Sequence, residues 1–460
     1  MRVIVCGAGQ VGLGIAERLS AEGNEVSIID SQASLVERAN EFLDVRAFQG
    51  NGAHPEVLER AGARDAEMLI AVTLYDEVNM VACQVANTIF ETPTRIARVR
   101  SQRYLEGRYN KLFADNGFAI NYIISPEVEV GNAVLRRLEL PGAFETFSFC
   151  DSNMTALGVS CGPDCPVIDT PLTQLADLFP DLPAAIVAIV RGGQLMVARS
   201  NDTLRIGDDI YVVVPSVAVA RTLKIFGHDE TEARRIVIAG GGNIGVYVAR
   251  TLEERERNVR VKLIEHNRDR AFEIAEVLKR ASVLHGSSLA EDILREADIQ
   301  SAETMVALTN DDQVNILTSV LAKQLGCQRS MCLWNSPGYA NMIRSFGIEG
   351  QVNPRGITTS RILQFVRRGK IRGVHAISNG RGELLEGEAL ETSPLVGAPI
   401  EKLRFSDGIR IGGIWRDGKA VPVRGKTQLQ PKDRVIIFAR MEQVREVEDM
   451  FRVSADYIDS

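Results

Sequence analysis

Two glycine-rich turns, each followed by a carboxylate, are the segments of this sequence best suited to bind a nucleotide. The first is Gly7-Ala8-Gly9-Gln10-Val11-Gly12, which follows a strand-like run, opens a helical stretch and has Asp30 at the end of the next predicted strand. In this pattern the first glycine permits a tight turn, the second lets a pyrophosphate approach the backbone, and the third allows close helix–strand packing. The helix N-terminus offers free N–H groups to phosphates, and Asp30 can accept hydrogen bonds from both ribose hydroxyls.

The second turn is Gly240-Gly241-Gly242-Asn243-Ile244-Gly245, with Glu265 in the position of Asp30. The alternative for each copy is a strand–turn–helix connection that holds no ligand, and this alternative is stronger for the second copy. A soluble nucleotide-binding protein is therefore indicated, with two sites that need not be equivalent.

A pair of arginines could add positive charge to the first site. Arg98 and Arg100 close the fifth predicted strand, and ligands of parallel α/β sheets bind at the carboxyl ends of the strands. Either side chain could reach a phosphate, or instead form a solvated strand end or an ion pair. In the second copy Trp334 is expected where Arg98 falls in the first, so that site is predicted to lack the cation.

The elements that position these residues are predicted by an internal duplication. Besides the two turns, Leu69-Ile70-Ala71-Val72-Thr73 returns as Met305-Val306-Ala307-Leu308-Thr309, and each is followed by an acidic pair and an asparagine. Short β-branched runs alternate with helical stretches, which is typical of a parallel sheet covered by helices on both faces. Ser125-Pro126 and Asn353-Pro354 each predict one more helix, capped by the first residue and started by the proline.

The segment after each copy is rich in short predicted strands and turns. A hairpin is expected across Gly192-Gly193, and the same layout recurs over the run from Ile409 through Asp417-Gly418 to Lys419. The fold class predicted is α/β: two Rossmann-like, doubly wound parallel-sheet domains, each followed by a small α+β domain. The boundaries expected are residues 1–140, 141–228, 233–370 and 371–455.

Composition excludes several classes of protein. The 460 residues carry a net charge of −7, which disfavours nucleic acid as a partner, and 45% of them are hydrophobic, as in ordinary globular chains. Seven cysteines without a regular spacing fit a reducing compartment. No run reaches the ~18–20 apolar residues that span a bilayer, and no signal peptide is evident. A cytoplasmic location is therefore expected.

Two further motifs do not indicate a binding site. Gly425-Lys426-Thr427 lacks the first glycine of a phosphate loop, and Cys161 and Cys165 lack nearby metal ligands, so no metal site is predicted. An enzyme is also disfavoured, because a dehydrogenase needs a substrate domain with an acid–base residue and residues 143–226 contain no histidine.

With these motifs in view, the whole chain resembles the TrkA family, the peripheral regulatory subunits of bacterial Trk potassium-uptake systems. The turn at 7–12, Asp30, Gly50-Asn51, Thr73 and Arg98-Val99-Arg100 carry the resemblance in the first copy. It implies two nucleotide-binding domains of the KTN or RCK type, each followed by a TrkA-C domain. It also implies NAD or NADH as ligand, with ATP or ADP as further ligands.

The resemblance assigns the binding residues position by position. In the first copy they are Gly7, Ala8, Gly9, Gln10, Val11, Gly12, Asp30, Asn51, Thr73, Leu74 and Arg98. In the second copy they are Gly240, Gly241, Gly242, Asn243, Ile244, Gly245, Glu265 and Thr309. No catalytic residue is assigned.

The function expected is that of a nucleotide-sensing, non-enzymatic subunit that gates potassium uptake through a membrane pore subunit of the TrkH or TrkG type. It would lie at the inner face of the cell membrane through that partner, as a homo-oligomer, expected to be a tetramer. The apolar residues of the helices after Pro126 and Pro354 are expected to pair the nucleotide domains of different copies. The alternatives are a soluble NAD-dependent oxidoreductase and a free-standing nucleotide-binding scaffold.

Overall fold

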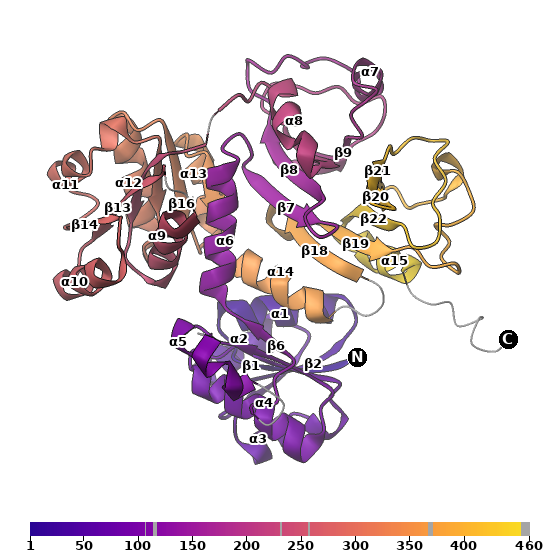
Figure 1. The fold of residues 1–460 in the computed structure, drawn as a ribbon. Coiled ribbons are helices and arrows are strands. Elements are labelled where there is room, and N and C mark those ends of the chain that lie inside the picture. The colour runs from indigo at the N-terminus through magenta and orange to yellow at the C-terminus, as the bar shows by residue number, and fades with distance from the viewer. Residues whose placement is uncertain (106, 114–116, 231, 256–257, 367–370, 452–460) are drawn as a thin grey trace. The chain divides into compact units, whose positions relative to one another are not determined.

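The computed structural model describes residues 1–105, 107–113, 117–230, 232–255, 258–366 and 371–451 (Figure 1). The chain forms two compact units, one from residues 1–130 with 353–366 and the other from residues 131–352 with 367–460. Among the residues that the structure describes, no helix has the length and apolar character needed to cross a membrane.

The first unit is built on a parallel six-stranded sheet with the order β3-β2-β1-β4-β5-β6. Its strands are β1 (Arg2–Cys6), β2 (Glu25–Asp30), β3 (Arg46–Gln49), β4 (Met68–Ala71), β5 (Thr94–Arg98) and β6 (Tyr122–Ile124). Its helices are α1 (Gln10–Ala21), α2 (Ala33–Phe42), α3 (Pro55–Arg60), α4 (Asp76–Phe90), α5 (Gln102–Leu105) and α14 (Pro354–Val366), with short 3-10 turns at Ala63–Asp65 and Gly107–Phe113.

Alternate strand residues bury two different faces of this sheet. Val5 lies in a core with Ile15 of α1 and Ile362 of α14, whereas the next residue, Cys6, lies in a core with Ala82 of α4. A period of two is what a strand covered on both faces produces. Both faces of the sheet are therefore covered, and ligands can reach it only at the ends of its strands.

Helix α14 helps to cover one face of the first sheet, although it follows the second parallel sheet in sequence. Ile362, Leu363 and Val366 are buried against α1 and β6 residues, and Phe365 stacks on Tyr122 with ring centroids 4.1 Å apart. The Asn353 side chain caps the helix by accepting a hydrogen bond from the Gly356 N–H at 3.0 Å, as predicted.

Helix α6 (Pro126–Glu139) makes the reciprocal contact within the second unit. Tyr247 of α9 (Asn243–Arg255) donates a hydrogen bond to Asn132 Oδ1 at 3.0 Å, and its ring lies against Gly131. The prediction that these two helices pair different copies of the chain rested on apolar faces without a partner. That reasoning was wrong for α14, because its apolar residues are buried inside this chain. It was also wrong for α6, because Val134, Leu135 and Leu138 are buried as well.

The second unit contains a parallel sheet of the same order, β14-β13-β12-β15-β16-β17. Its strands are β12 (Arg235–Ala239), β13 (Arg260–Glu265), β14 (Ser282–His285), β15 (Thr304–Ala307), β16 (Arg329–Leu333) and β17 (Gly350–Val352). The accompanying helices are α9, α10 (Arg268–Val277), α11 (Glu291–Glu296), α12 (Asp312–Gln324) and α13 (Ala340–Ser345), with 3-10 turns at Ile299–Ser301 and Pro337–Tyr339. The duplication predicted from the sequence is thus confirmed strand by strand.

Two antiparallel five-stranded sheets complete this unit. One has the order β10-β9-β11-β8-β7, from β7 (Glu145–Phe149), β8 (Met154–Ser160), β9 (Ala185–Arg191), β10 (Gln194–Val197) and β11 (Asp209–Pro215). The other has the order β18-β19-β22-β20-β21, from β18 (Ile371–Ile377), β19 (Gly382–Glu388), β20 (Ile409–Arg416), β21 (Lys419–Val421) and β22 (Arg434–Arg440). The helices with them are α7 (Leu172–Leu178), α8 (Val219–Ile225) and α15 (Val444–Met450), with 3-10 turns at Ser216–Ala218, Ser378–Gly380, Ile400–Lys402 and Met441–Gln443.

The two antiparallel sheets share one hydrophobic core. Val187 and Val213 of the first sheet lie in the same cluster as Ile436 and Phe438 of the second. A Cβ added at Gly412 would lie 2.6 Å from Val187 Cγ1, so only glycine fits there. The sheets therefore pack closely enough to act as one body.

The predicted hairpin across Gly192-Gly193 is confirmed, because β9 and β10 pair in antiparallel fashion on either side of it. Cys161 and Cys165 are buried free thiols in an ordinary turn, closed by the Cys165 N–H donating to the Gly162 carbonyl at 3.1 Å. The α/β fold class is also confirmed. The exact four-domain boundaries stay a prediction.

Candidate functional site

The first glycine turn has the geometry that the sequence predicts. Gly7 has a φ of 108°, and a Cβ added at Gly12 would lie 1.7 Å from the Gly7 carbonyl oxygen, so helix α1 packs directly on the turn. A Cβ added at Gly9 would meet nothing within 4 Å. Gly9 is the N-cap residue of α1 and has no side chain to cap it, so the first N–H groups of the helix, from Gln10 and Val11, face this open space.

The Asp30 carboxylate closes the turn from the neighbouring strand. Its Oδ2 accepts a hydrogen bond from the Ala8 N–H at 2.7 Å, and its Oδ1 accepts one from the Gln32 N–H at 2.9 Å. Asp30 remains partly exposed, so the carboxylate can hold the turn and still face solvent. A carboxylate oxygen accepts more than one hydrogen bond, which leaves capacity for ribose hydroxyls.

The loop after β4 brings Thr73 to the same edge of the sheet. The buried Asn79 side chain accepts hydrogen bonds from the Thr73 N–H and hydroxyl, both at 2.8 Å, and donates to the Arg98 carbonyl at 2.9 Å. Leu74 is exposed beside Thr73. Asn51 follows β3 on the same edge and closes its own loop by accepting from the Ala53 N–H at 2.9 Å.

Arg98 lies at the end of β5 as a partly buried cation. Its Nη2 donates to the Thr73 carbonyl at 2.8 Å, while its buried Nε has no hydrogen-bond partner in the described structure. Burial lowers the pKa of the Arg98 guanidinium, and Arg100 lowers it further. Such a desolvated charge gains from an anionic ligand, because charge-assisted hydrogen bonds are the strong ones.

Arg100 is held differently from Arg98. Its Nε donates to Glu127 Oε1 at 2.8 Å, and Glu127 is buried at the start of α6. The Asp76 carboxylate accepts hydrogen bonds from the N–H groups of Arg100 and Ser101, each at 2.9 Å. Of the two alternatives left open by the sequence, Arg100 therefore forms an ion pair, and Arg98 is the arginine free to meet a phosphate.

The second copy reproduces the turn and its carboxylate. Gly240 has a φ of 106°, a Cβ added at Gly245 would lie 2.0 Å from the Gly240 carbonyl oxygen, and Gly242 has open space at the helix N-terminus. Glu265 accepts from the Gly241 N–H at 2.7 Å and, unlike Asp30, is buried. The turn that begins with Gly240 to Gly242 continues through Asn243 and Ile244, which start α9.

Thr309 lies beside the second turn as Thr73 lies beside the first, and Asn315 replaces Asn79. The Asn315 side chain accepts from the Thr309 N–H at 2.8 Å and donates to the Leu333 carbonyl at 3.0 Å. The residue equivalent to Arg98 is therefore Leu333.

The prediction that Trp334 occupies the Arg98 position was consequently wrong by one residue. The backbone N–H of Trp334 donates to the Val352 carbonyl at 2.9 Å, as the backbone N–H of Val99 does to Ile124. The Trp334 side chain is buried in a core with Ile343. The second edge still lacks the cation at the strand end, but Trp334 is a packing residue.

Sequence reasoning missed an arginine at the second turn. Arg270 on α10 donates from Nε to the Gly241 carbonyl at 3.1 Å and pairs with Glu273 at 2.9 Å. It also gave no role to Asn79 and Asn315, although an asparagine six residues after each threonine was the signal. Both amides fix the loop that faces the turn.

The described residues contain no group of three or more His, Cys, Asp or Glu side chains that could hold a metal ion. What the first edge offers is an open helix N-terminus, a carboxylate and a desolvated guanidinium. This arrangement suits an adenosine ribose joined to phosphates.

Comparisons with known proteins agree with this arrangement. The family model described as the TrkA-N domain matches residues 3–126 and 236–354, and that of the TrkA-C domain matches residues 384–452. The Trk system potassium uptake protein TrkA of Azorhizobium caulinodans is 54% identical over 457 residues, which cover 99% of this chain and 100% of the relative. The protein of the same name from Vibrio alginolyticus is 33% identical over 462 residues and covers 100% of both chains.

Solved structures share the fold at low identity. The GsuK RCK domain superposes with a TM-score of 0.61 at 16% identity, covering 98% of this chain and 94% of that chain. The GsuK channel bound to NAD also gives 0.61 at 16% identity, covering 98% of this chain and 78% of that chain.

Proposed function

We propose a regulatory function in potassium uptake for this chain, which belongs to the TrkA family of Trk potassium uptake proteins. The chain binds NAD or NADH, or alternatively ATP or ADP, at the first glycine turn. Binding changes how the chain acts on a membrane pore subunit of the TrkH or TrkG type. The location is then the inner face of the cell membrane, through that subunit.

The observation that carries the nucleotide proposal is the open space at Gly9 between Asp30 and Arg98. An adenosine ribose fits the carboxylate side, and phosphates fit the helix N-terminus and the guanidinium. The GsuK channel, which shares this fold, is bound to NAD in one structure and to ADP in another. The proposal gives the same two ligand classes to this chain.

Helix α1 supplies a route from the nucleotide to the rest of the chain. It begins at the turn, and α14 packs along its buried side, where Arg355 lies beside Gly14 and its Nη2 lies 3.9 Å from Glu17 Oε2. A shift of α1 on nucleotide binding therefore displaces a helix that leads into the C-terminal part of the chain. A ligand changes such an equilibrium only by its different affinity for the two arrangements.

We also propose that the chain forms a homo-oligomer, expected to be a tetramer. The surface that joins the copies differs from the first prediction, which used the helices after Pro126 and Pro354. Val81 and Ile89 on α4 are 41% and 51% exposed, and Leu317 at the equivalent place on α12 is 52% exposed. Exposed apolar residues in the same place on both copies favour contacts between chains.

The family membership disfavours the oxidoreductase alternative, because the relatives are potassium uptake proteins.

A pair of glycine substitutions tests the proposal. Gly9→Ala adds a methyl group to open space at an ordinary φ of −68°, so the fold should be retained while a pyrophosphate is kept away from the backbone. Gly242→Ala is the matched control in the second copy, where the space is equally open. Potassium uptake is measured in cells that lack the gene and carry the wild-type chain or either variant.

We expect the wild-type chain and Gly242→Ala to restore regulated uptake, and Gly9→Ala to fail to do so while losing NADH binding in calorimetry. Uptake unchanged by restoring the wild-type chain would refute the regulatory function. Regulated uptake with a Gly9→Ala chain that no longer binds nucleotide would refute the sensing role.

A further inference from the structure

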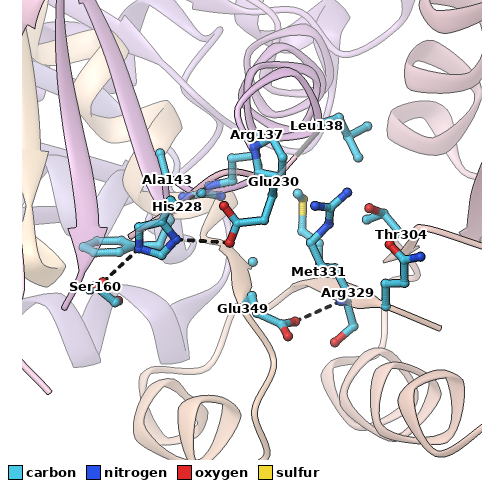
Figure 2. Close-up of a pocket in the computed structure, with 16 residues that line it drawn as sticks. Arg137, Leu138, Ala143, Ser160, His228, Glu230, Thr304, Arg329, Met331 and Glu349 are labelled. Carbon is cyan, nitrogen blue, oxygen red and sulfur yellow. Dashed lines mark hydrogen bonds and ion pairs between the residues drawn. The ribbon is translucent and has the colours of Figure 1, made fainter. Parts of the chain in front are cut away.

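The second parallel sheet has a hollow at one end of its strands and the second glycine turn at the other. The hollow is a cavity at the amino ends of β15, β16 and β17, and its lining includes His228, Glu230 and Glu349 (Figure 2). Its acidic groups are already engaged, because Glu230 Oε1 lies 3.1 Å from His228 Nδ1 and Glu349 accepts from a backbone N–H at 3.0 Å. The glycine turn lies at the carboxyl ends of the strands, where parallel sheets bind their ligands. We therefore expect a ligand of this sheet at the turn.

The carboxylate of the second turn is covered by protein. Glu265 Oε2 accepts a hydrogen bond from the Gly241 N–H at 2.7 Å, and its Oε1 accepts one from the Asn267 N–H at 2.8 Å. A Cβ added at Gly241 would lie 2.3 Å from Ile274 Cδ1, so α10 packs directly on the turn. Glu265 is 6% exposed as a result, whereas Asp30 in the first copy is partly exposed. Glu265 therefore holds the turn but presents little of its charge to a ligand.

Arg270 of α10 lies over the same turn. Its Nε donates to the Gly241 carbonyl at 3.1 Å, and its Nη1 donates to Glu273 Oε2 at 2.9 Å. The side chain is 39% exposed, and no hydrogen bond among the described residues uses its Nη2. The Glu273 carboxylate is exposed, and exposed ion pairs are weak, so a phosphate can take its place.

The first turn carries a leucine where the second carries Arg270. Helices α2 and α10 each begin three residues after the carboxylate, so Leu35 corresponds to Arg270. Leu35 packs against the core of the first sheet. Conversely, Leu333 stands in the second copy where Arg98 stands in the first. The arginine near the turn therefore comes from the end of β5 in the first copy and from the helix after the carboxylate in the second.

This difference favours different nucleotides. In folds of this kind a carboxylate after the second strand binds the hydroxyls of the adenosine ribose, whereas an arginine nearby accommodates a phosphate on that ribose. We propose that the second glycine turn binds an adenine dinucleotide with a phosphate on its adenosine ribose, the class of NADP and NADPH, and that Arg270 holds this phosphate. The inference rests on the nucleotide-binding function proposed above and extends it. One chain then has separate sites for the two classes of dinucleotide.

The test measures NADPH and NADH binding to the purified full-length chain by calorimetry, because these probes differ only by the phosphate on the ribose. Gly9→Ala blocks the first turn, so that the second is measured alone. Arg270→Leu introduces the residue of the first copy, and Glu273→Gln removes the carboxylate that competes for Arg270. Arg250→Leu is the matched control, because this exposed arginine in the middle of α9 forms a similar ion pair, with Glu254 at 2.9 Å.

In the Gly9→Ala chain we expect NADPH to bind about tenfold or more tightly than NADH, as a charge-assisted hydrogen bond provides. Adding Arg270→Leu should remove this preference. Adding Glu273→Gln should tighten NADPH binding about two- to fivefold, the size of an exposed ion pair, which a misfolded chain would not do. Arg250→Leu should leave both affinities unchanged. Equal binding of NADPH and NADH, an unchanged NADPH affinity after Arg270→Leu, or the same loss after Arg250→Leu would overturn the proposal.

Failure of this inference and failure of the proposed function give different results. A wild-type chain that binds no NADH contradicts the proposed function, while the comparison of Arg270→Leu with its parent still decides the role of Arg270. A chain that binds NADH at the first turn and shows no preference for NADPH at the second contradicts this inference alone.

Discussion

Replacement of Arg98 by leucine, the residue that the second copy carries at this position, should separate nucleotide affinity from stability. Arg98 makes one described hydrogen bond, to the Thr73 carbonyl, and its Nε is buried and unpaired. The loss of that bond is partly offset by removal of a desolvated charge. We therefore expect the free energy of unfolding without nucleotide to change by less than about 1 kcal/mol.

The effect on nucleotide binding should be larger. A charge-assisted contact to a phosphate contributes about 1.5–3 kcal/mol, which is roughly a ten- to hundredfold change in affinity. A nucleotide present at about 100 times its Kd stabilises the wild-type chain by about 2.7 kcal/mol. After a tenfold loss of affinity the same concentration gives about 1.4 kcal/mol.

Isothermal titration with NADH and thermal unfolding with and without nucleotide measure both quantities. Arg270→Leu is the control, because it removes an arginine that donates to the glycine turn of the second copy. The reasoning fails if Arg98→Leu binds NADH like the wild-type chain. It also fails if Arg270→Leu causes the larger loss, since the second turn would then be the principal site.

Three further predictions concern stability. Burial alone would raise the pKa of the Asp208 carboxyl, but hydrogen bonds from Arg191 and the Arg205 N–H hold it below its ordinary value. The stabilisation that Asp208 gains from Arg191 is present above about pH 4 and is lost as the pH falls below it. In Asp208→Asn the free energy of unfolding should therefore fall less steeply as the pH is lowered. Ile362→Ala should cost about 2–5 kcal/mol in denaturant unfolding, because this α14 side chain is fully buried against α1. Gly412→Ala should cost about 1–3 kcal/mol in the same assay, since its methyl group would overlap a valine of the facing sheet. Unchanged unfolding in any of these variants would show that the contact concerned is absent in solution.

The features that could be predicted from the sequence are those that depend on local pattern. Gly7, Gly12 and Asp30 take the predicted places because tight turns, close helix packing and strand ends depend on residues that are neighbours in sequence. The helices after Pro126 and Pro354 also begin where the proline requires.

The features that could not be predicted depend on partners distant in sequence. The apolar face of α14 showed that Ile362 needs burial, but nothing local indicates that α1 covers it. The error at Trp334 arose because residue spacing between the copies is not constant. The amides of Asn79 and Asn315, each bound to the carbonyl at the end of a strand, show that Arg98 and Leu333 are equivalent positions.

The placement of α14 has a consequence for synthesis of the chain. Residues 1–130 leave the ribosome before residues 353–366, so the sheet face that α14 covers lacks its helix while the intervening 222 residues, 131–352, are made. At ~5–20 residues per second this interval lasts roughly 11–44 s. During that time Ile124 of β6 lacks the helix that covers it in the folded chain. The nascent first unit is therefore expected to be a client of chaperones that bind exposed apolar strands, and to become independent of them only after residue 366 has emerged.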